Sequence, residues 1–250
     1  SSKGNQLKWL KDGIWYKADY TGYEGLSEYV VSELLKKSTL KPTEFIEYQP
    51  EQIIYRGKTM TGCRSRDFLS PGWRIITLER LFQNAYGVSL YASIYRFPDA
   101  KARLEFLVKQ LTGLRDFGAY LAKLLAVDAF FLNEDRHMHN IAVLERGQGI
   151  YDYCPIFDNG AGLLSDTTLD YPMEGDIYAM MDEVSSKTVS THFEEQLEAA
   201  EELFGCQLHF RFTKRDVREV LTGADAYPKE VTERVETILR EQMRKYQYLF

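Results

Sequence analysis

Residues 114–132 (LRDFGAYLAKLLAVDAFFL) constrain the fold more than any other stretch of this sequence. Their apolar side chains would surround a helix on nearly every side, and a helix of that kind has to be buried in a protein core. A polar, charged loop at 133–140 follows directly, and a short apolar run begins at 141. The pattern predicts a core helix that ends in a loop of reactive side chains, which then enters a strand.

The composition is that of a folded protein large enough to bury such a helix. Of 250 residues, 44% are hydrophobic and 27% are charged, which fits neither a disordered chain nor a coiled coil. The net charge of -6 disfavours direct binding to nucleic acid, which usually needs a basic face. No apolar run approaches the roughly 18 to 20 residues that cross a bilayer, so no membrane partner is expected.

Cysteine usage and the chain start bear on the cellular compartment. Cys63, Cys154 and Cys206 are odd in number and scattered, which suits a reducing cytosol better than a disulfide framework. The sequence has no signal peptide, and a start at Ser1 without methionine indicates trimming. A cytoplasmic location is therefore expected.

The N-terminal quarter has the pattern of a small β-rich unit. Residues 5–18 alternate as a hairpin around Lys11-Asp12-Gly13, and 44–48 and 52–63 are predicted strands with a turn at Gly57-Lys58. A helix is predicted over 25–37, with Ser27 as its N-cap.

The pattern changes after Pro71-Gly72, where helical periods dominate. Apart from the core helix, the predicted helices are 77–86 (capped by Thr77), 99–111, 193–204, 214–222 and 228–249, and the predicted strands are 141–145 and 150–157. The polar, Ser/Thr-rich stretch 165–192 suits a mobile loop. The fold class is therefore α+β, with a small β-rich lobe over 1–68 and a larger helical lobe over 69–250.

The loop 133–140 carries a pair of side chains suited to phosphoryl transfer. Asp135 could orient an attacking hydroxyl and accept its proton, while Asn140, five residues on, offers a neutral oxygen to Mg²⁺. Asp158 ends the predicted strand 150–157, where its carboxylate could also bind Mg²⁺. A hairpin lies between Asn140 and Asp158, so both could reach one metal cluster. His137 and His139 have no third ligand at a suitable spacing, so zinc is not expected.

The pattern Asn133-x-Asp135-x-His137-x-x-Asn140, followed by Asp158, resembles the catalytic and metal loops of the phosphoinositide-kinase-like branch of the protein-kinase fold. It is still more similar to the HipA family of bacterial serine/threonine kinases. The resemblance implies a two-lobed kinase fold with ATP and Mg²⁺ bound between the lobes. His137 is expected to pack against the catalytic loop and to hydrogen-bond within it.

The N-terminal residues resemble the same family in the correct order. The run Ser1-x-x-Gly4-x-Gln6-x-Lys8 is similar to the family's phosphate loop, and the resemblance implies that Ser1 is an autophosphorylation site. Lys17 looks like the lysine that holds the nucleotide phosphates. The resemblance favours Glu28 as its acidic partner, with Glu24 and Glu33 as alternatives. The strand 60–68, which includes Cys63, is the expected hinge against adenine.

Several features depart from the family pattern. The order Asp135-Arg136-His137 replaces His-Arg-Asp, and the triplet Asp116-Phe117-Gly118 is a decoy because it precedes the catalytic loop. HipA-family proteins commonly carry a further N-terminal domain. Such a domain was removed from this chain, or it is a separate subunit, or this member is a minimal kinase. The resemblance implies a serine/threonine kinase with a protein substrate, of the kind found as a toxin, with an antitoxin or a separate N-terminal-domain-like subunit as partner. A lipid or small-molecule kinase and a non-catalytic pseudokinase are the alternatives.

Overall fold

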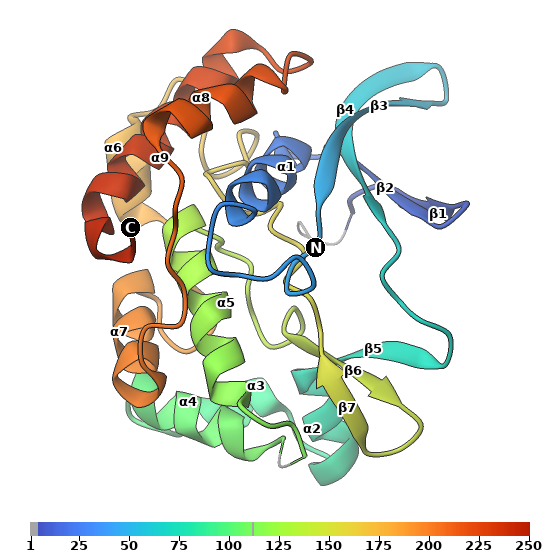
Figure 1. Cartoon of the computed structure of the whole chain (residues 1–250), viewed down its shortest axis with the longest axis vertical. Helices are drawn as coiled ribbons and strands as arrows, with labels where there is room; N and C mark the ends of the chain where they lie inside the picture. The colour runs from blue at the N-terminus through green and yellow to red at the C-terminus, as the bar shows by residue number, and fades with distance from the viewer. Residues whose placement is uncertain (1–4, 112) are drawn as a thin grey trace.

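A four-stranded antiparallel sheet and one helix form the N-terminal end of the molecule (Figure 1). The computed structural model describes residues 5–111 and 113–250. The sheet has the order β1-β2-β4-β3. Its elements are β1 (Lys8–Lys11), β2 (Ile14–Ala18), β3 (Tyr48–Tyr55), β4 (Lys58–Arg66) and helix α1 (Glu24–Leu35), which packs on β3 and β4.

Two tight turns close the hairpins of this sheet. Asp12-Gly13 and Arg56-Gly57 have both central residues at positive φ, which matches the right-handed twist of the flanking strands. Helix α1 approaches the sheet at Gly25 and Gly62. A Cβ on Gly62 would lie 2.2 Å from the carbonyl oxygen of Lys17, so only glycine fits there.

The rest of the chain is mainly helical and includes a second, three-stranded sheet of order β5-β6-β7. Its strands are β5 (Trp73–Thr77), β6 (Ala142–Arg146) and β7 (Ile150–Tyr153). The helices are α2 (Leu78–Tyr86), α3 (Leu90–Ile94), α4 (Ala100–Lys109), α5 (Phe117–Phe131), α6 (Ile177–Glu183), α7 (Phe193–Phe204), α8 (Lys214–Thr222), α9 (Lys229–Lys245) and the 3-10 turn η1 (Gln247–Leu249).

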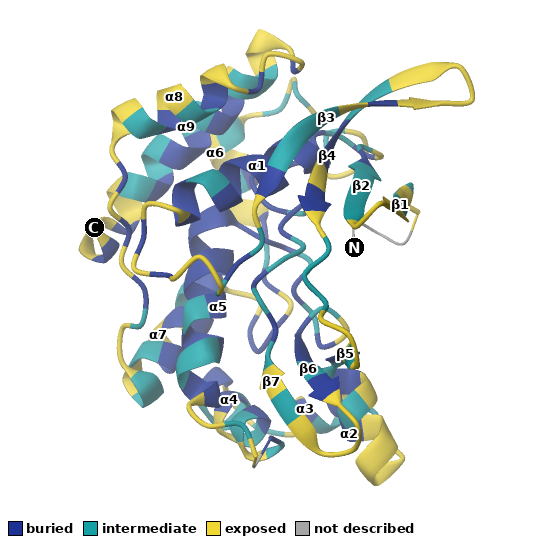
Figure 2. Cartoon of the chain, turned by 45° about the vertical axis from the view of Figure 1, so that its right-hand side comes forward, coloured by how far each residue is buried: buried dark blue, intermediate teal, exposed yellow. Residues whose placement is uncertain are grey.

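Helix α5 is the centre of the helical part, as its sequence predicts. Twelve of its 15 residues are buried, and Figure 2 shows it dark along most of its length. The ring of Phe130 lies 4.5 Å from that of Phe210. The chain leaves the helix at Leu132 in a left-handed conformation and enters the polar loop. No helix in the described residues is long and apolar enough to cross a membrane.

Several predicted elements need correction. Ser27 is not the N-cap of α1: it lies inside the helix, and its hydroxyl donates to the carbonyl oxygen of Asn159 at 2.6 Å. The strand predicted at 44–48 begins only at Tyr48, because residues 44–47 make just an isolated bridge from Phe45 to Ile156. The sequence patterns also missed β5, α3 and α6, and α6 replaces part of the loop expected over 165–192.

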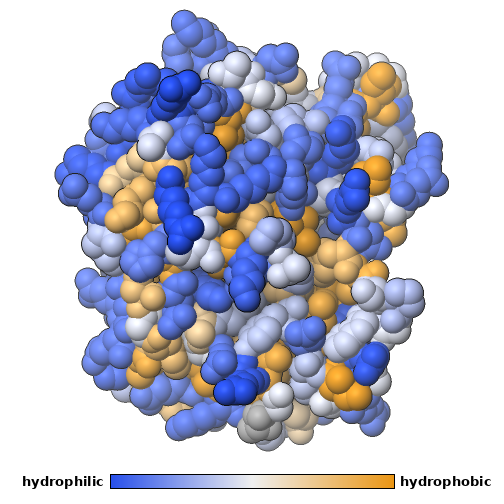
Figure 3. All heavy atoms as spheres, viewed as in Figure 1, coloured by the Kyte–Doolittle hydropathy of each residue, from blue (hydrophilic) through white to orange (hydrophobic). Residues whose placement is uncertain are grey.

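The molecular surface is mostly hydrophilic on the face of Figure 1. Figure 3 shows only scattered hydrophobic patches there. The apolar side chains of α5, such as Leu121, Leu125 and Phe130, are instead buried in the core, as the sequence predicts.

Candidate functional site

A cavity of about 310 Å³ opens between the N-terminal sheet and the residues that follow β7. Some of its lining residues are charged and others are apolar. The apolar residues include Phe68 and Phe157, whose ring centroids are 5.7 Å apart. The lining residues are Gln6, Lys8, Trp15, Lys17, Ile46, Tyr48, Ser65, Arg66, Asp67, Phe68, Leu69, Ile75, Phe157 and Asp158.

Lys17 is the central charge of this cavity. Strand β2 carries it, and its ammonium lies 3.2 Å from a carboxylate oxygen of Glu28 and 3.4 Å from one of Asp158. It also lies 5.3 Å from the ring centroid of Tyr48. The backbone N–H of Asn159 donates to the other oxygen of Glu28 at 3.0 Å, so the helix glutamate holds both the lysine and the chain beside Asp158.

Glu28 is thus the glutamate of α1 that contacts Lys17, and the two alternatives lie elsewhere. Glu24 caps the loop before the helix, accepting hydrogen bonds from the backbone N–H groups of Thr21 and Gly22. Glu33 pairs with Lys36 at 2.7 Å.

The three charged groups influence each other's protonation. Burial opposes the charge on Lys17, but the carboxylates of Glu28 and Asp158 outweigh it and raise the pKa of Lys17 well above its ordinary value. Burial also opposes ionisation of Asp158, yet the Lys17 ammonium lowers the pKa of that carboxyl below its ordinary value. Burial raises the pKa of Glu28. Asp158 is therefore the carboxylate that stays charged over the wider pH range.

The loop after α5 is organised around Asp135. The Asn140 amide donates to the backbone oxygen of Asp135 at 2.7 Å and to its carboxylate at 3.3 Å. The His137 Nε2 atom lies 3.6 Å from that carboxylate, and the backbone N–H of His139 donates to His137 Nδ1. Burial lowers the pKa of His137, although the nearby Asp135 carboxylate opposes this shift.

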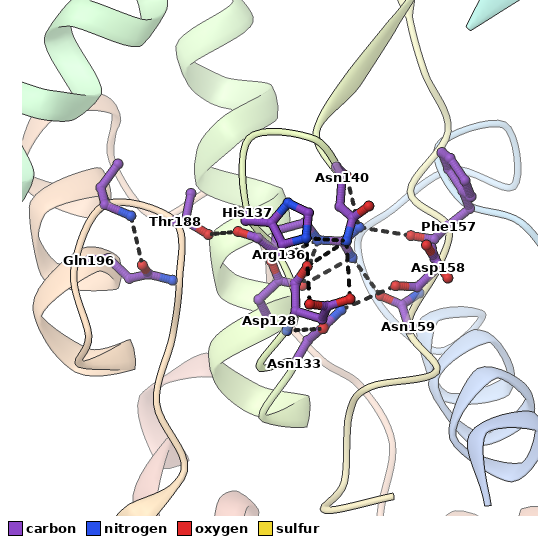
Figure 4. A network of polar contacts seen from close by, with 12 residues as sticks. Asp128, Asn133, Arg136, His137, Asn140, Phe157, Asp158, Asn159, Thr188 and Gln196 are labelled. Carbon is purple, nitrogen blue, oxygen red and sulfur yellow. Dashed lines mark hydrogen bonds and ion pairs between the residues drawn. The ribbon is translucent and has the colours of Figure 1, made fainter. Parts of the chain in front are cut away.

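Arg136 joins this loop to the segment that carries Asp158 (Figure 4). Its guanidinium pairs with the buried Asp128 of α5 at 3.0 Å. It also donates to the carbonyl oxygen of Phe157 at 2.9 Å and to the side-chain oxygen of Asn159 at 2.9 Å. The hydroxyl of Thr188 donates to the Arg136 carbonyl. The two polar loops are consequently held by one buried cation.

The side chains that could hold Mg²⁺ are few. The Asn140 amide nitrogen faces Asp135, so its oxygen is turned toward the side of Asp158 (Figure 4). No group of three or more His, Cys, Asp or Glu side chains within the described ranges is arranged to hold a metal. One carboxylate and one amide oxygen fit Mg²⁺ that takes its other oxygens from substrate phosphates and water.

The predicted N-terminal and hinge residues divide into three groups. Gln6 and Lys8 line the cavity, and the Gln6 amide donates to the Ala18 carbonyl at 3.0 Å. Cys63 is fully buried and does not line it; residues 65–69 of β4 and the following link do. Ser1 and Gly4 lie outside the described residues.

No family model and no curated protein matches the sequence. Solved structures do match. The Helicobacter pylori proinflammatory kinase CtkA is 14% identical with a TM-score of 0.64, over 98% of this chain and 89% of that one. HipA of Shewanella oneidensis MR-1, solved with HipB and operator DNA, is 13% identical with a TM-score of 0.51. That match covers 98% of this chain and 64% of HipA.

The chain has a HipA-like kinase fold. The predicted α+β class, with a small antiparallel N-terminal lobe and a helical lobe, is thereby confirmed.

Within this HipA-like fold, the sequence patterns missed several residues that shape the site. Tyr48 and Phe157 line the cavity, and Asp128 holds Arg136. A signal for Asp128 was present, because it is a lone carboxylate inside an otherwise apolar helix and therefore needs a buried partner. Nothing in the sequence marks Tyr48 or Phe157 among many other aromatic residues.

Proposed function

We propose that the protein is an ATP- and Mg²⁺-dependent phosphotransferase that acts on a serine or threonine hydroxyl of a protein. The observation that supports this most is that Lys17, paired with the buried Glu28, lies beside Asp158 in the lining of a cavity with both charged and apolar walls. Apolar walls suit a purine ring, and the charged group suits its phosphates.

The proposed chemistry assigns one task to each side chain. Lys17 holds the nucleotide phosphates, and Glu28 fixes the direction of its ammonium. Asp158 and Asn140 would hold Mg²⁺, which supplies charge neutralisation on the phosphates when bound. Asp135 orients the incoming hydroxyl and accepts its proton.

Asn133 connects the two loops that must act together. Its side-chain oxygen accepts from the Asp135 N–H at 3.2 Å, and its amide donates to the Asp158 carbonyl at 3.3 Å. The proposed base and the proposed metal ligand are therefore fixed relative to each other before any substrate arrives. Positioning of this kind supplies much of the rate in phosphoryl transfer.

The HipA likeness supports an extension of the proposal to a partner. The HipA structure contains HipB as part of a toxin–antitoxin system. We extend the proposal to a protein antitoxin, or a separate subunit, that binds this chain in the cytoplasm.

The proposal is tested with Asp135→Asn and radiolabelled ATP, measuring γ-phosphate transfer to the protein itself and to a cell lysate. The loss of the proton acceptor is expected to lower kcat by about 100-fold or more, while Mg²⁺–ATP affinity changes less than about threefold. Asp116→Asn is the matched control, because it alters the decoy triplet at an exposed position. Transfer by Asp135→Asn at the wild-type rate would show that Asp135 is not the base.

A further inference from the structure

A strained turn lies five residues beyond Asp158. Leu163 and Leu164 have φ of 54° and 56°, and both are buried. Two successive leucines in the left-handed region are uncommon, because the Cβ of an L-residue crowds its own backbone there. Such a conformation persists only where the surroundings hold it, and it concentrates at functional sites.

Two side chains from distant elements hold this turn by its carbonyl oxygens. The Tyr23 hydroxyl, just before α1, donates to the Leu163 oxygen at 2.5 Å. The Arg234 guanidinium, on α9, donates to the Leu164 oxygen at 2.8 Å. The segment lies between α9 and the start of α1 (Figure 1).

Arg234 contacts further residues of the segment 163–173. It also donates to the oxygens of Tyr171 and Pro172, at 2.9 and 3.1 Å, and lies 5.8 Å from the ring centroid of Tyr23. Arg234 is only 3% exposed, and no carboxylate pairs with it in the part of the chain that the structure describes. Burial of a guanidinium without a paired carboxylate is costly, so an apolar side chain would serve simple packing better.

The clamped segment is joined in turn to the loop that starts α1. The Tyr23 N–H donates to the Ser165 oxygen at 3.1 Å, and the Thr168 N–H donates to the Thr21 oxygen at 3.0 Å. A Cβ on Gly22 would lie 1.8 Å from the Ser165 oxygen, so the two backbones meet where only glycine fits. Helix α1 begins at Glu24, and its residue Glu28 contacts Lys17.

We propose that Arg234 and Tyr23 are positioning residues that clamp the Leu163–Leu164 turn, and that this clamp keeps Glu28 and Asp158 in register on Lys17. The expected effect on kcat rests on the proposed phosphotransfer. The expected effect on the backbone of the turn does not. Release of the clamp would let the turn relax and free the start of α1. The nucleotide cavity itself would remain, because neither residue lines it.

The variants for the test are Arg234→Lys, Tyr23→Phe and the double substitution. Lysine keeps the charge but cannot donate to three carbonyls in the planar fork of arginine. We expect Arg234→Lys to lower kcat about tenfold or more while the KM for ATP changes less than threefold. Tyr23→Phe should lower kcat severalfold, and the double variant should fall short of the product of the two effects, because both act on one turn. Arg244→Lys, exposed on the same helix, is the control and should match wild type.

Hydrogen exchange of residues 163–173 without nucleotide gives a readout that does not depend on activity. We expect exchange there to accelerate at least tenfold in Arg234→Lys, with α5 unchanged. The proposed clamp would be wrong if hydrogen exchange of residues 163–173 were unchanged in Arg234→Lys. It would also be wrong if the fall in kcat of the double variant equalled the product of the two single effects. If wild type transfers no phosphate but the exchange result holds, the proposed function fails and the clamp stands.

Discussion

Two half-buried aspartates have pKa values shifted in opposite directions by their surroundings. Asp158 faces the Lys17 ammonium, which lowers its pKa despite burial. Asp19 pairs with no cation among the described residues, and burial raises its pKa to about 6 although it accepts hydrogen bonds from Thr61, Gly25 and Tyr227. The first carboxylate is thus kept charged, while the second, just after β2, accepts hydrogen bonds from residues in α1, on β4 and in the α8–α9 loop.

The raised pKa of Asp19 predicts a pH-dependent stability. A carboxyl with a folded pKa near 6 and an unfolded value near 3.8 favours folding fully below pH about 4, and this contribution is lost as the pH rises through 6. Asp19→Asn should therefore exceed wild type in free energy of unfolding by a margin that grows between pH 4 and 7, to at most about 3 kcal/mol.

Urea unfolding at several pH values measures that margin. Asp225→Asn, an exposed position two residues before Tyr227, is the control and should give a constant difference. A margin for Asp19→Asn that stays flat from pH 4 to 7 would contradict the argument.

Among the helices, α5 is stabilised by the packing of its apolar side chains, and its one buried carboxylate, Asp128, pairs with Arg136. Burial raises the pKa of Asp128 even though Arg136 lies against it, so the pair is costly to keep in the core. The ion pair holds Arg136 where its guanidinium donates to the carbonyl oxygen of Phe157 and to the side-chain oxygen of Asn159.

Asp128→Asn should destabilise the fold by about 3 kcal/mol or more, because it leaves a buried guanidinium without its counter-ion. Thermal and denaturant unfolding measure the loss. Asp116→Asn, exposed at the start of the same helix, should stay within about 0.5 kcal/mol of wild type. A loss for Asp128→Asn as small as that of the control would mean that the ion pair does not hold the loops.

Local patterns predicted most of the helices and two of the three strands of the smaller sheet. Helices α7 and α8 have the bounds that their amphipathic periods predict, and Thr77 caps α2 as expected. Strand β5 was missed because it pairs with β6, which lies about 65 residues later, and nothing local marks that partner. Ser27 failed as a cap because its hydroxyl binds Asn159, a tertiary contact.

At the scale of the whole molecule, the candidate site is assembled from distant parts of the chain. Lys17 and Asp158 are 141 residues apart, and the sequence could name both through a motif but could not show them in contact. Tyr23 and Arg234 belong to no motif, and only the folded chain brings both onto one turn. Motif residues are therefore predictable here, whereas the residues that position them are not.

We propose that the cavity lined by Lys17 binds ATP, with Mg²⁺ held through Asp158. Isothermal titration calorimetry with ATP, with and without Mg²⁺, tests it most directly on wild type and on Asp158→Asn. Asp152→Asn, exposed on β7, is the control and should behave as wild type. We expect Mg²⁺-dependent binding to wild type, and a loss of about tenfold or more in that Mg²⁺-dependent affinity for Asp158→Asn. Equal Mg²⁺–ATP affinity in wild type and Asp158→Asn, or no ATP binding by wild type, would contradict it.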